Sequence, residues 1–187
     1  MRLWLVRHAA VQLAPGICYG ASDVPADPEH TAACAQRLAQ ALPEMPAVRC
    51  SPLGRCRNLA DALQARRPGL QAAIDPRLAE MDFGHWEGQP WDGIGAAALA
   101  AWTDDFAQHR PGGGEPLAEF LGRVGQALQA TAALGVPQAL WITHAGVIKA
   151  VRWLLADAGP ITRADQWPTD SVACGDWCVL ELPAIRG

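Results

Sequence analysis

Two short apolar segments of this sequence each end in a histidine, and the residues around them suit anion chemistry. Residues 3–6 are followed by Arg7 and His8, and residues 139–143 are followed by His144. A guanidinium group offers forked donors that match the oxygens of an anion, and a neutral imidazole is nucleophilic near pH 7. Such a set can bind an oxyanion and transfer a group or a proton.

The first segment alone favours a plainer interpretation, in which Arg7 is a solvated strand end and His8 a hydrogen-bonded structural histidine. The second segment changes the balance, because small residues and apolar residues at helix spacing, from Val147 to Leu155, follow His144. Reactive groups of open α/β sheets lie just past the carboxyl ends of strands. We therefore expect both histidines over one sheet edge, with His144 beside a helix N-terminus that favours an anion.

Two further stretches carry candidate groups. Arg55 falls in the first turn of a helix expected to open at residues 51–53. An arginine there is mildly unfavourable for the helix dipole, so Arg55 is either a surface charge or is tolerated because an anion binds nearby. Residues 78–88 mix carboxylates with aromatic side chains and fit neither structural period, which predicts a loop that lines a site.

Composition bounds the alternatives. The chain has 187 residues, of which 50% are hydrophobic and 18% charged, so we expect one domain over residues 1–187 and not a disordered chain. A formal net charge of −4 argues against a nucleic-acid partner. No segment resembles a membrane span or a signal peptide, so we expect no membrane association.

The six cysteines show no metal-ligand spacing. No C-x-x-C pair occurs, so we expect no metal and no cofactor, and reduced thiols in the cytoplasm. A disulfide framework is the less favoured alternative. Oligomeric state cannot be derived from these patterns.

The order of the elements predicts an α/β fold, a three-layer sandwich around a mostly parallel central sheet. A Pro- and Gly-rich loop, residues 15–23, follows the first strand directly and can wall a pocket. Pro116 is expected at the first helical position of an amphipathic helix. We expect strands at residues 3–6, 48–50, 72–75, 139–143 and 177–182. We expect helices at residues 29–42, 91–107 and 147–155, and two more that begin at residues 51–53 and at residue 117.

These residues resemble the histidine phosphatase superfamily, also called phosphoglycerate mutase-like, over nearly the whole chain. Each matching stretch is weak alone, but five in the family's order are a strong signal. The stretches are Arg7-His8-Ala9, Ser51-Pro52-Leu53-Gly54-Arg55, residues 80–88, residues 111–115 and Thr143-His144-Ala145-Gly146. The resemblance implies the same sandwich fold and a phosphomonoester hydrolase that needs no metal and acts on a small phosphate ester.

The resemblance also implies a role for each candidate residue. His8 is the expected nucleophile, which forms a phosphohistidine. Arg7, Arg55 and His144 are the expected phosphate ligands, and they stabilise charge on the phosphoryl oxygens. Glu80 is the expected general acid, with a pKa raised by burial. Asp82 and Glu87 rank below Glu80 as acids, because both suit surface or hydrogen-bonding roles better.

A narrower similarity concerns the loop after the first strand. Residues 16–20 followed by Asp23-Val24-Pro25 are similar to α-ribazole phosphatases, which act late in cobalamin assembly. This similarity implies a substrate with a planar base and substrate contacts at Tyr19 and Gly20. Trp86 and Trp91 either line the same pocket mouth or pack in the core.

The sequence departs from the family at three small residues. Ala9 and Ala145 replace glycines usually found after the two histidines, and their backbone conformation decides whether alanine is tolerated. Ala14 replaces an asparagine that can donate a hydrogen bond to phosphate. These departures keep open a catalytically silent phosphate-binding module, and the fold itself keeps open a phosphoglycerate mutase-type phosphotransferase.

Overall fold

The computed structural model describes residues 1–43 and 46–182. Its central sheet has the strand order β3-β2-β4-β1-β5. Neighbouring strands among the first four are parallel, and β5 runs antiparallel to β1 along one edge. The predicted mostly parallel α/β sheet is confirmed. The strands are β1 (Arg2–Arg7), β2 (Ala47–Cys50), β3 (Ala72–Ile74), β4 (Gln138–Thr143) and β5 (Trp177–Glu181).

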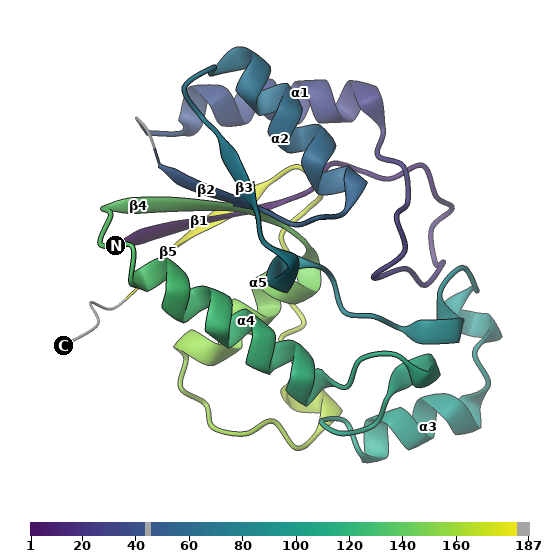
Figure 1. Cartoon of the computed structure of the whole chain (residues 1–187). Coiled ribbons are helices and arrows are strands. Elements are labelled where there is room, and N and C mark those ends of the chain that lie inside the picture. Colours follow the sequence, from purple (N-terminus) through teal and green to yellow (C-terminus); the bar gives the residue numbers. More distant parts are fainter. Residues whose placement is uncertain (44–45, 183–187) are drawn as a thin grey trace.

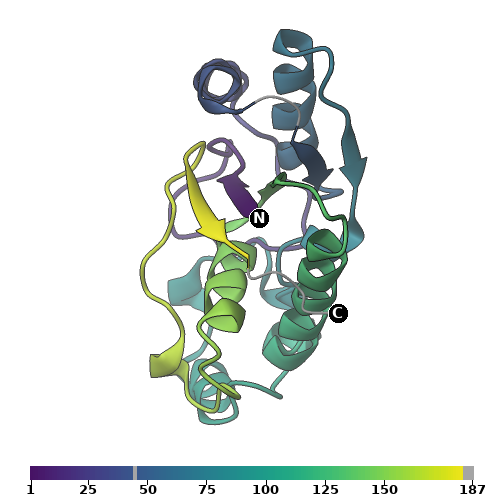
Figure 2. The ribbon, with the colours of Figure 1, turned by 90° about the vertical axis from the view of Figure 1, so that its left-hand side faces the viewer.

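Helices cover both faces of this sheet, as Figures 1 and 2 show. On one face lie α1 (Pro28–Ala41) and α2 (Gly54–Arg66), and on the other lie α4 (Leu117–Ala132) and α5 (Ala145–Leu155). Two hydrophobic cores result, one on each face. Because both faces are covered, the central strands are apolar without alternation, and the three-layer sandwich prediction is confirmed.

Successive residues of β4 enter opposite cores. Leu140 and Ile142 pack in the core beneath α1 and α2, whereas Trp141 packs with Phe120 and Val151 beneath α4 and α5. All three β4 side chains are fully buried. The amphipathic helix predicted from residue 117 is present as α4, but Pro116 is its N-cap and not its first helical residue, because its backbone is extended (φ −74°, ψ 151°).

The helix predicted at residues 91–107 is wrong as one element. The structure has a 3₁₀ turn at Trp91–Gly93 and then a shorter helix, α3 (Ala96–Asp104), whose N-cap is Gly95. Glycines at 93 and 95 disfavour a continuous helix, and the break lets Trp91 stack on Trp102 at a centroid distance of 6.4 Å. The packing of these aromatic rings, and not helical spacing, therefore determines where the helix of this segment begins.

The sheet has its topological switch point between β1 and β4. These strands are neighbours, yet the helix after β1 lies on one face of the sheet and the helix after β4 lies on the other (Figure 1). Ligands of open α/β sheets bind where the chain diverges in this way, outside the carboxyl ends of the strands. Arg7 pairs with Thr143 in the register, so the residues that follow them, His8 and His144, reach this point side by side.

Two general features concern the whole described chain. All six cysteines are free thiols. None of the described helices combines the length and the apolar character that crossing a membrane requires.

Candidate active site

His8 lies just past the end of β1 and is almost completely buried, with 2% of its surface exposed. Its Nδ1 lies 2.7 Å from the carbonyl oxygen of Ala9, so Nδ1 carries the proton and donates it to that oxygen. Nε2 is then left with its lone pair, as a nucleophile requires. Burial, together with the nearby Arg55 and Arg7 charges, lowers the pKa of His8 to about 3. His8 is therefore a neutral imidazole at pH 7.

His144 is the N-cap of α5 and lies against His8, with 5.1 Å between the ring centroids. Its Nδ1 accepts a hydrogen bond from Nε of Arg55 at 3.3 Å, which makes Nε2 the protonated nitrogen. Nε2 donates to the hydroxyl oxygen of Ser51 at 2.7 Å. Burial, then the charge of Arg55, holds the pKa of His144 well below its ordinary value.

Arg55 is fully buried in the first turn of α2, so its interpretation as a surface charge is wrong. Nη1 donates to the carbonyl oxygen of Ser22 at 2.7 Å, and Nη2 donates to that of Gly20 at 2.6 Å. The guanidinium also lies over the ring of Tyr19, 5.3 Å from its centroid. Arg55 therefore connects His144 to the loop of residues 15–23.

Arg7 contributes a donor from the other side of the histidines. Its Nη1 donates to the carbonyl oxygen of Val172 at 2.9 Å. Its Nε is buried and has no hydrogen-bond partner within the described part of the chain. A buried N–H donor without a partner is costly, and an anion beside His8 is a partner that would satisfy it.

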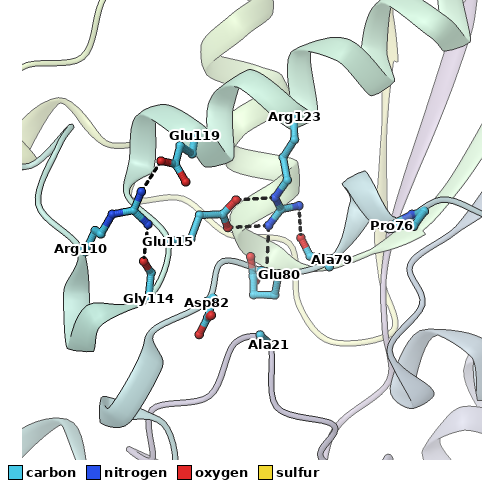
Figure 3. A pocket seen from close by; sticks show the side chains of 10 residues that line it. All are labelled: Ala21, Pro76, Ala79, Glu80, Asp82, Arg110, Gly114, Glu115, Glu119 and Arg123. Atoms are coloured by element: carbon cyan, nitrogen blue, oxygen red, sulfur yellow. Dashed lines mark hydrogen bonds and ion pairs between the residues drawn. The ribbon is translucent and has the colours of Figure 1, made fainter.

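Glu80 reaches the same edge of the sheet from the segment after β3. Its Oε2 accepts from the backbone N–H of Gly146 at 3.0 Å, and its Oε1 accepts from that of Met81 at 3.1 Å. Burial raises the pKa of Glu80, although these two hydrogen bonds and the charges of Arg55 and Arg123 act in the opposite direction. Glu80 also borders a pocket of about 400 Å³ (Figure 3). The N-terminus of α5 therefore binds the carboxyl group of Glu80 through the backbone N–H of Gly146.

Glycine is required at position 146 by that contact. A Cβ atom there would lie 2.3 Å from Oε1 of Glu80, so any side chain would displace the carboxylate. Two of the departures from the family pattern, Ala9 and Ala145, are compatible with the backbone. Asp157 is the one described non-glycine residue with positive φ, so Ala9 and Ala145 occupy backbone conformations that alanine adopts readily.

Asp82 and Glu87 have hydrogen-bonding roles, as the sequence favours. Asp82 is exposed and accepts from the backbone N–H of Gly84 at 2.7 Å. Glu87 accepts from the backbone N–H groups of Ala21, Ser22 and Phe83. Burial alone would raise the pKa of Glu87, but the hydrogen bonds from these groups hold it below its usual value. Glu87 is therefore ionised and suited to holding the loop.

The family comparison agrees with this geometry. The model of the histidine phosphatase superfamily, branch 1, matches residues 3–181. The chain belongs to the histidine phosphatase superfamily.

Similar proteins of this superfamily span nearly the whole chain. The adenosylcobalamin/alpha-ribazole phosphatase of Salmonella typhimurium is 31% identical, covering 97% of this chain and 91% of its own length. The crystal structure of the alpha-ribazole phosphatase from Shigella flexneri has a TM-score of 0.80 at 28% identity, covering 98% of this chain and 91% of its own. A crystal structure from Thermus thermophilus has a TM-score of 0.73 at 32% identity, covering 98% and 95%.

The predicted substrate contacts of this histidine phosphatase occupy different surroundings. Tyr19 is half-buried over Arg55, at the inner side of the loop. Gly20 is buried, and a Cβ atom there would lie 1.9 Å from the carbonyl oxygen of Met81, so its lack of a side chain serves packing. Trp86 is buried in an aromatic cluster with Trp102, so of the two alternatives left open by the sequence, core packing holds for Trp86.

Sequence reasoning missed three residues that shape the site. Ser51 orients His144, and Asp23 accepts from the backbone N–H of Gly54 at the start of α2. Arg123 binds the segment that carries Glu80. Ser51 lies in a family stretch and gave a signal, whereas Arg123 gave none beyond an arginine near the buried face of an amphipathic helix. Within residues 1–43 and 46–182, no three His, Cys, Asp or Glu side chains are grouped as metal ligands.

Proposed function

We propose that this histidine phosphatase hydrolyses phosphate monoesters through a phosphohistidine formed on Nε2 of His8. The observation that carries the proposal is the 2.7 Å hydrogen bond from Nδ1 of His8 to the carbonyl oxygen of Ala9. This bond fixes the tautomer whose free lone pair is on Nε2, beside His144 and Arg55. The low pKa of His8 keeps that lone pair available at physiological pH.

In the first step, Nε2 of His8 attacks phosphorus and the bond from phosphorus to the ester oxygen breaks. Arg7, Arg55 and His144 donate hydrogen bonds to the phosphoryl oxygens and stabilise the charge that develops there. Arg55 must exchange its carbonyl partners in the loop for phosphate oxygens to do so. His144 must likewise turn the N–H of its Nε2 from the hydroxyl of Ser51 to a phosphate oxygen. In its protonated form, which burial favours by raising the pKa of Glu80, this residue gives its proton to the leaving alkoxide.

In the second step, Glu80 is a carboxylate and takes a proton from water while the water oxygen attacks the phosphohistidine. The bond from phosphorus to Nε2 breaks, inorganic phosphate leaves, and both His8 and Glu80 return to their starting protonation states. Throughout both steps, Arg7 and Arg55 neutralise charge on the phosphoryl group, and the neutral His144 adds a hydrogen bond.

The substrate we propose is a small ester with a planar base, α-ribazole 5′-phosphate, in cobalamin biosynthesis. The names of the Salmonella typhimurium and Shigella flexneri relatives support this choice, and the half-buried Tyr19 ring beside Arg55 is a surface for stacking. Both relatives are phosphatases by name, which favours hydrolysis over a mutase. A cytoplasmic location remains a prediction that rests on the free thiols.

The test of the mechanism is His8→Ala. We expect turnover to fall by roughly 10³-fold or more, because the nucleophile is lost, while the thermal unfolding midpoint shows a folded protein. Wild type quenched during turnover of a ³²P-labelled ester should carry acid-labile label on His8. A folded His8→Ala protein that retains turnover would contradict the phosphohistidine mechanism.

A further inference from the structure

Arg123 in α4 uses every N–H of its guanidinium group. Nε donates to Oε1 of Glu115 at 2.6 Å, and Nη2 donates to Oε2 of Glu115 at 2.8 Å. Nη1 donates to the carbonyl oxygens of Arg77 and Ala79 at 2.8 Å and 2.7 Å, and Nη2 donates to that of Glu80 at 3.1 Å. Five donors therefore meet five acceptors, which is the full capacity of an arginine. Figure 3 shows the bonds of Arg123 to Glu115, Ala79 and Glu80.

These contacts fix the short segment that ends at Glu80. The carbonyl oxygens of residues 77, 79 and 80 all point to Arg123, and the remaining one, of Leu78, accepts from the hydroxyl of Thr143 at 2.8 Å. Thr143 is the last residue of β4 and precedes His144. The segment is thus held between α4 and the strand that delivers a phosphate ligand.

The backbone and the side chain of Glu80 are held by different parts of the chain. Arg123 binds its backbone carbonyl from one side, and the N–H of Gly146 at the start of α5 binds its carboxylate from the other. The Arg123–Glu115 ion pair is partly buried, with side-chain exposures of 21% and 16%. A bidentate pair shielded from solvent holds one geometry better than an exposed pair does.

We propose that Arg123, held by Glu115, is a positioning residue that aims the carboxyl group of Glu80 at the leaving-group oxygen. This inference rests on the proposed role of Glu80 as general acid. Its physical basis is distance: a catalytic group displaced by about 1 Å loses of the order of 10²-fold in rate. Arg123 touches neither histidine, so it acts on the reaction through Glu80.

The first experiment uses Arg123→Lys, which keeps the positive charge but replaces a planar fork by a single ammonium group. Lysine has three donors on one nitrogen and cannot reach both carboxylate oxygens and three carbonyls. We expect kcat for alkyl phosphates to fall by roughly 10- to 10²-fold, because their leaving groups need a proton. For 4-nitrophenyl phosphate, whose leaving group hardly needs one, we expect less than about a threefold loss.

The matched control is Arg110→Lys. Arg110 also borders the pocket of Figure 3 and pairs with Glu119, but this pair is exposed and Arg110 contacts no residue of the 77–80 segment. We expect the control to keep the wild-type ratio of alkyl to aryl rates. A general effect of arginine loss in this region would change both variants alike, which would contradict the proposal.

A double-mutant cycle with Glu80→Gln separates positioning from a structural effect. If Arg123 acts through Glu80, then Arg123→Lys in the Glu80→Gln background causes no further change in the alkyl-to-aryl ratio. Additive losses in the two backgrounds would overturn the positioning role. An equal loss for alkyl and aryl esters in Glu80→Gln alone would instead overturn the assignment of Glu80 as acid.

A second variant keeps the proposal testable if Arg123→Lys fails to fold. Glu115→Gln keeps one acceptor oxygen but presents an amide N–H to the guanidinium, so Arg123 loses half of its bidentate partner. We again expect kcat to fall more for alkyl phosphates than for 4-nitrophenyl phosphate, but by a smaller factor than in Arg123→Lys. A folded Glu115→Gln protein with the wild-type alkyl-to-aryl ratio would overturn the proposal.

Discussion

At the scale of single residues, each of the two buried histidines has a hydrogen-bond partner that sets its tautomer. The carbonyl of Ala9 sets the tautomer of His8, and the N–H of Arg55 sets that of His144. Burial then keeps both rings neutral and keeps Glu80 more easily protonated. Burial disfavours the charged form of each group, so it favours the neutral imidazole of His8 and the protonated form of Glu80 in the same site.

Gly146→Ala tests how closely Glu80 is held. The new Cβ would lie 2.3 Å from Oε1, and the carboxyl group, as the end of a flexible chain, must shift. Alanine also favours the helix by roughly 0.5–1 kcal/mol over glycine. We expect the turnover rate of alkyl phosphates to fall roughly 10²-fold. The free energy of unfolding should change little.

The control for this change is Gly125→Ala in α4, where a Cβ makes an ordinary contact of 3.8 Å with Leu154. Steady-state kinetics with an alkyl ester and urea unfolding compare the two variants. A Gly146→Ala protein with wild-type kcat would show that the contact between Glu80 and the helix N-terminus does not matter for catalysis.

Residue types and spacing predicted most of the individual site residues, and the gaps have a physical cause. His8, His144 and Arg55 follow strands or open a helix, so local patterns place them at one sheet edge. The contact between Glu80 and Gly146 joins residues 66 positions apart, and no local pattern carries it. The same holds for Arg123, which binds residues 43 to 46 positions away.

At the scale of elements, three helices begin at a carboxylate. The side chain of Asp27 caps α1, Asp23 binds the backbone N–H of Gly54 at the start of α2, and Glu80 binds that of Gly146 in α5. Exposed N–H groups and the helix dipole favour negative charge at each position. The sequence predicts an anion at the start of α5, and it does not reveal that the side chain of Glu80 also binds there.

Element boundaries were predicted well where apolar spacing decides them. The helix expected at residues 29–42 is α1, Pro28–Ala41, since Asp27 caps it and Pro28 suits its first turn. The segment 91–107 was wrong because aromatic packing of Trp91 against Trp102 overrides helical spacing. Tertiary contacts of this kind cannot be derived from one sequence.

The loop of residues 15–23 is the element we expect to select the substrate. Glu87 binds its N–H groups at Ala21 and Ser22, and Arg55 binds its carbonyls at Gly20 and Ser22, so Tyr19 lies beside well-held backbone. We predict a higher kcat/KM for α-ribazole 5′-phosphate than for 3-phosphoglycerate, because the base can stack on an aromatic face.

Tyr19→Ala should narrow that preference about fivefold, through a loss of the order of 1 kcal/mol in stacking. Tyr19→Phe is the matched control, since it keeps the ring and removes the hydroxyl. A substrate panel measures kcat/KM for both esters with all three proteins. A panel in which 3-phosphoglycerate is the better wild-type substrate would contradict the loop's role and leave the phosphohistidine mechanism standing.

At the scale of the whole molecule, the sheet order brings together groups from distant parts of the sequence. The ends of β1, β4 and β2 supply His8, His144 and Ser51, and the backbone N–H of His8 donates to the carbonyl of Thr143 at 3.0 Å. The α/β class followed from the alternation of elements. The order β3-β2-β4-β1-β5 did not, because nothing in the sequence alone specifies which strands pair.

Burying two neutral histidines also makes the stability of the molecule depend on pH. The pKa of His8 is about 3 in the folded protein, against an ordinary value of 6.5 for a histidine, and the pKa of His144 is lowered as well. Below pH 6.5 the unfolded chain therefore binds protons that the folded chain does not, and the free energy of unfolding falls with falling pH. The raised pKa of Glu80 acts in the opposite direction, since the folded state binds that proton more readily.

A comparison with His8→Asn isolates the contribution of His8, because Glu80 and His144 remain in both proteins. The asparagine amide can still donate to the carbonyl of Ala9 but does not titrate. Between about pH 7 and pH 5, we expect wild type to lose about 2 kcal/mol more unfolding free energy than His8→Asn. Urea unfolding followed by circular dichroism across this range measures both slopes. Equal slopes would mean that His8 takes up a proton in the folded protein, and the neutral nucleophile would then be lost in mild acid.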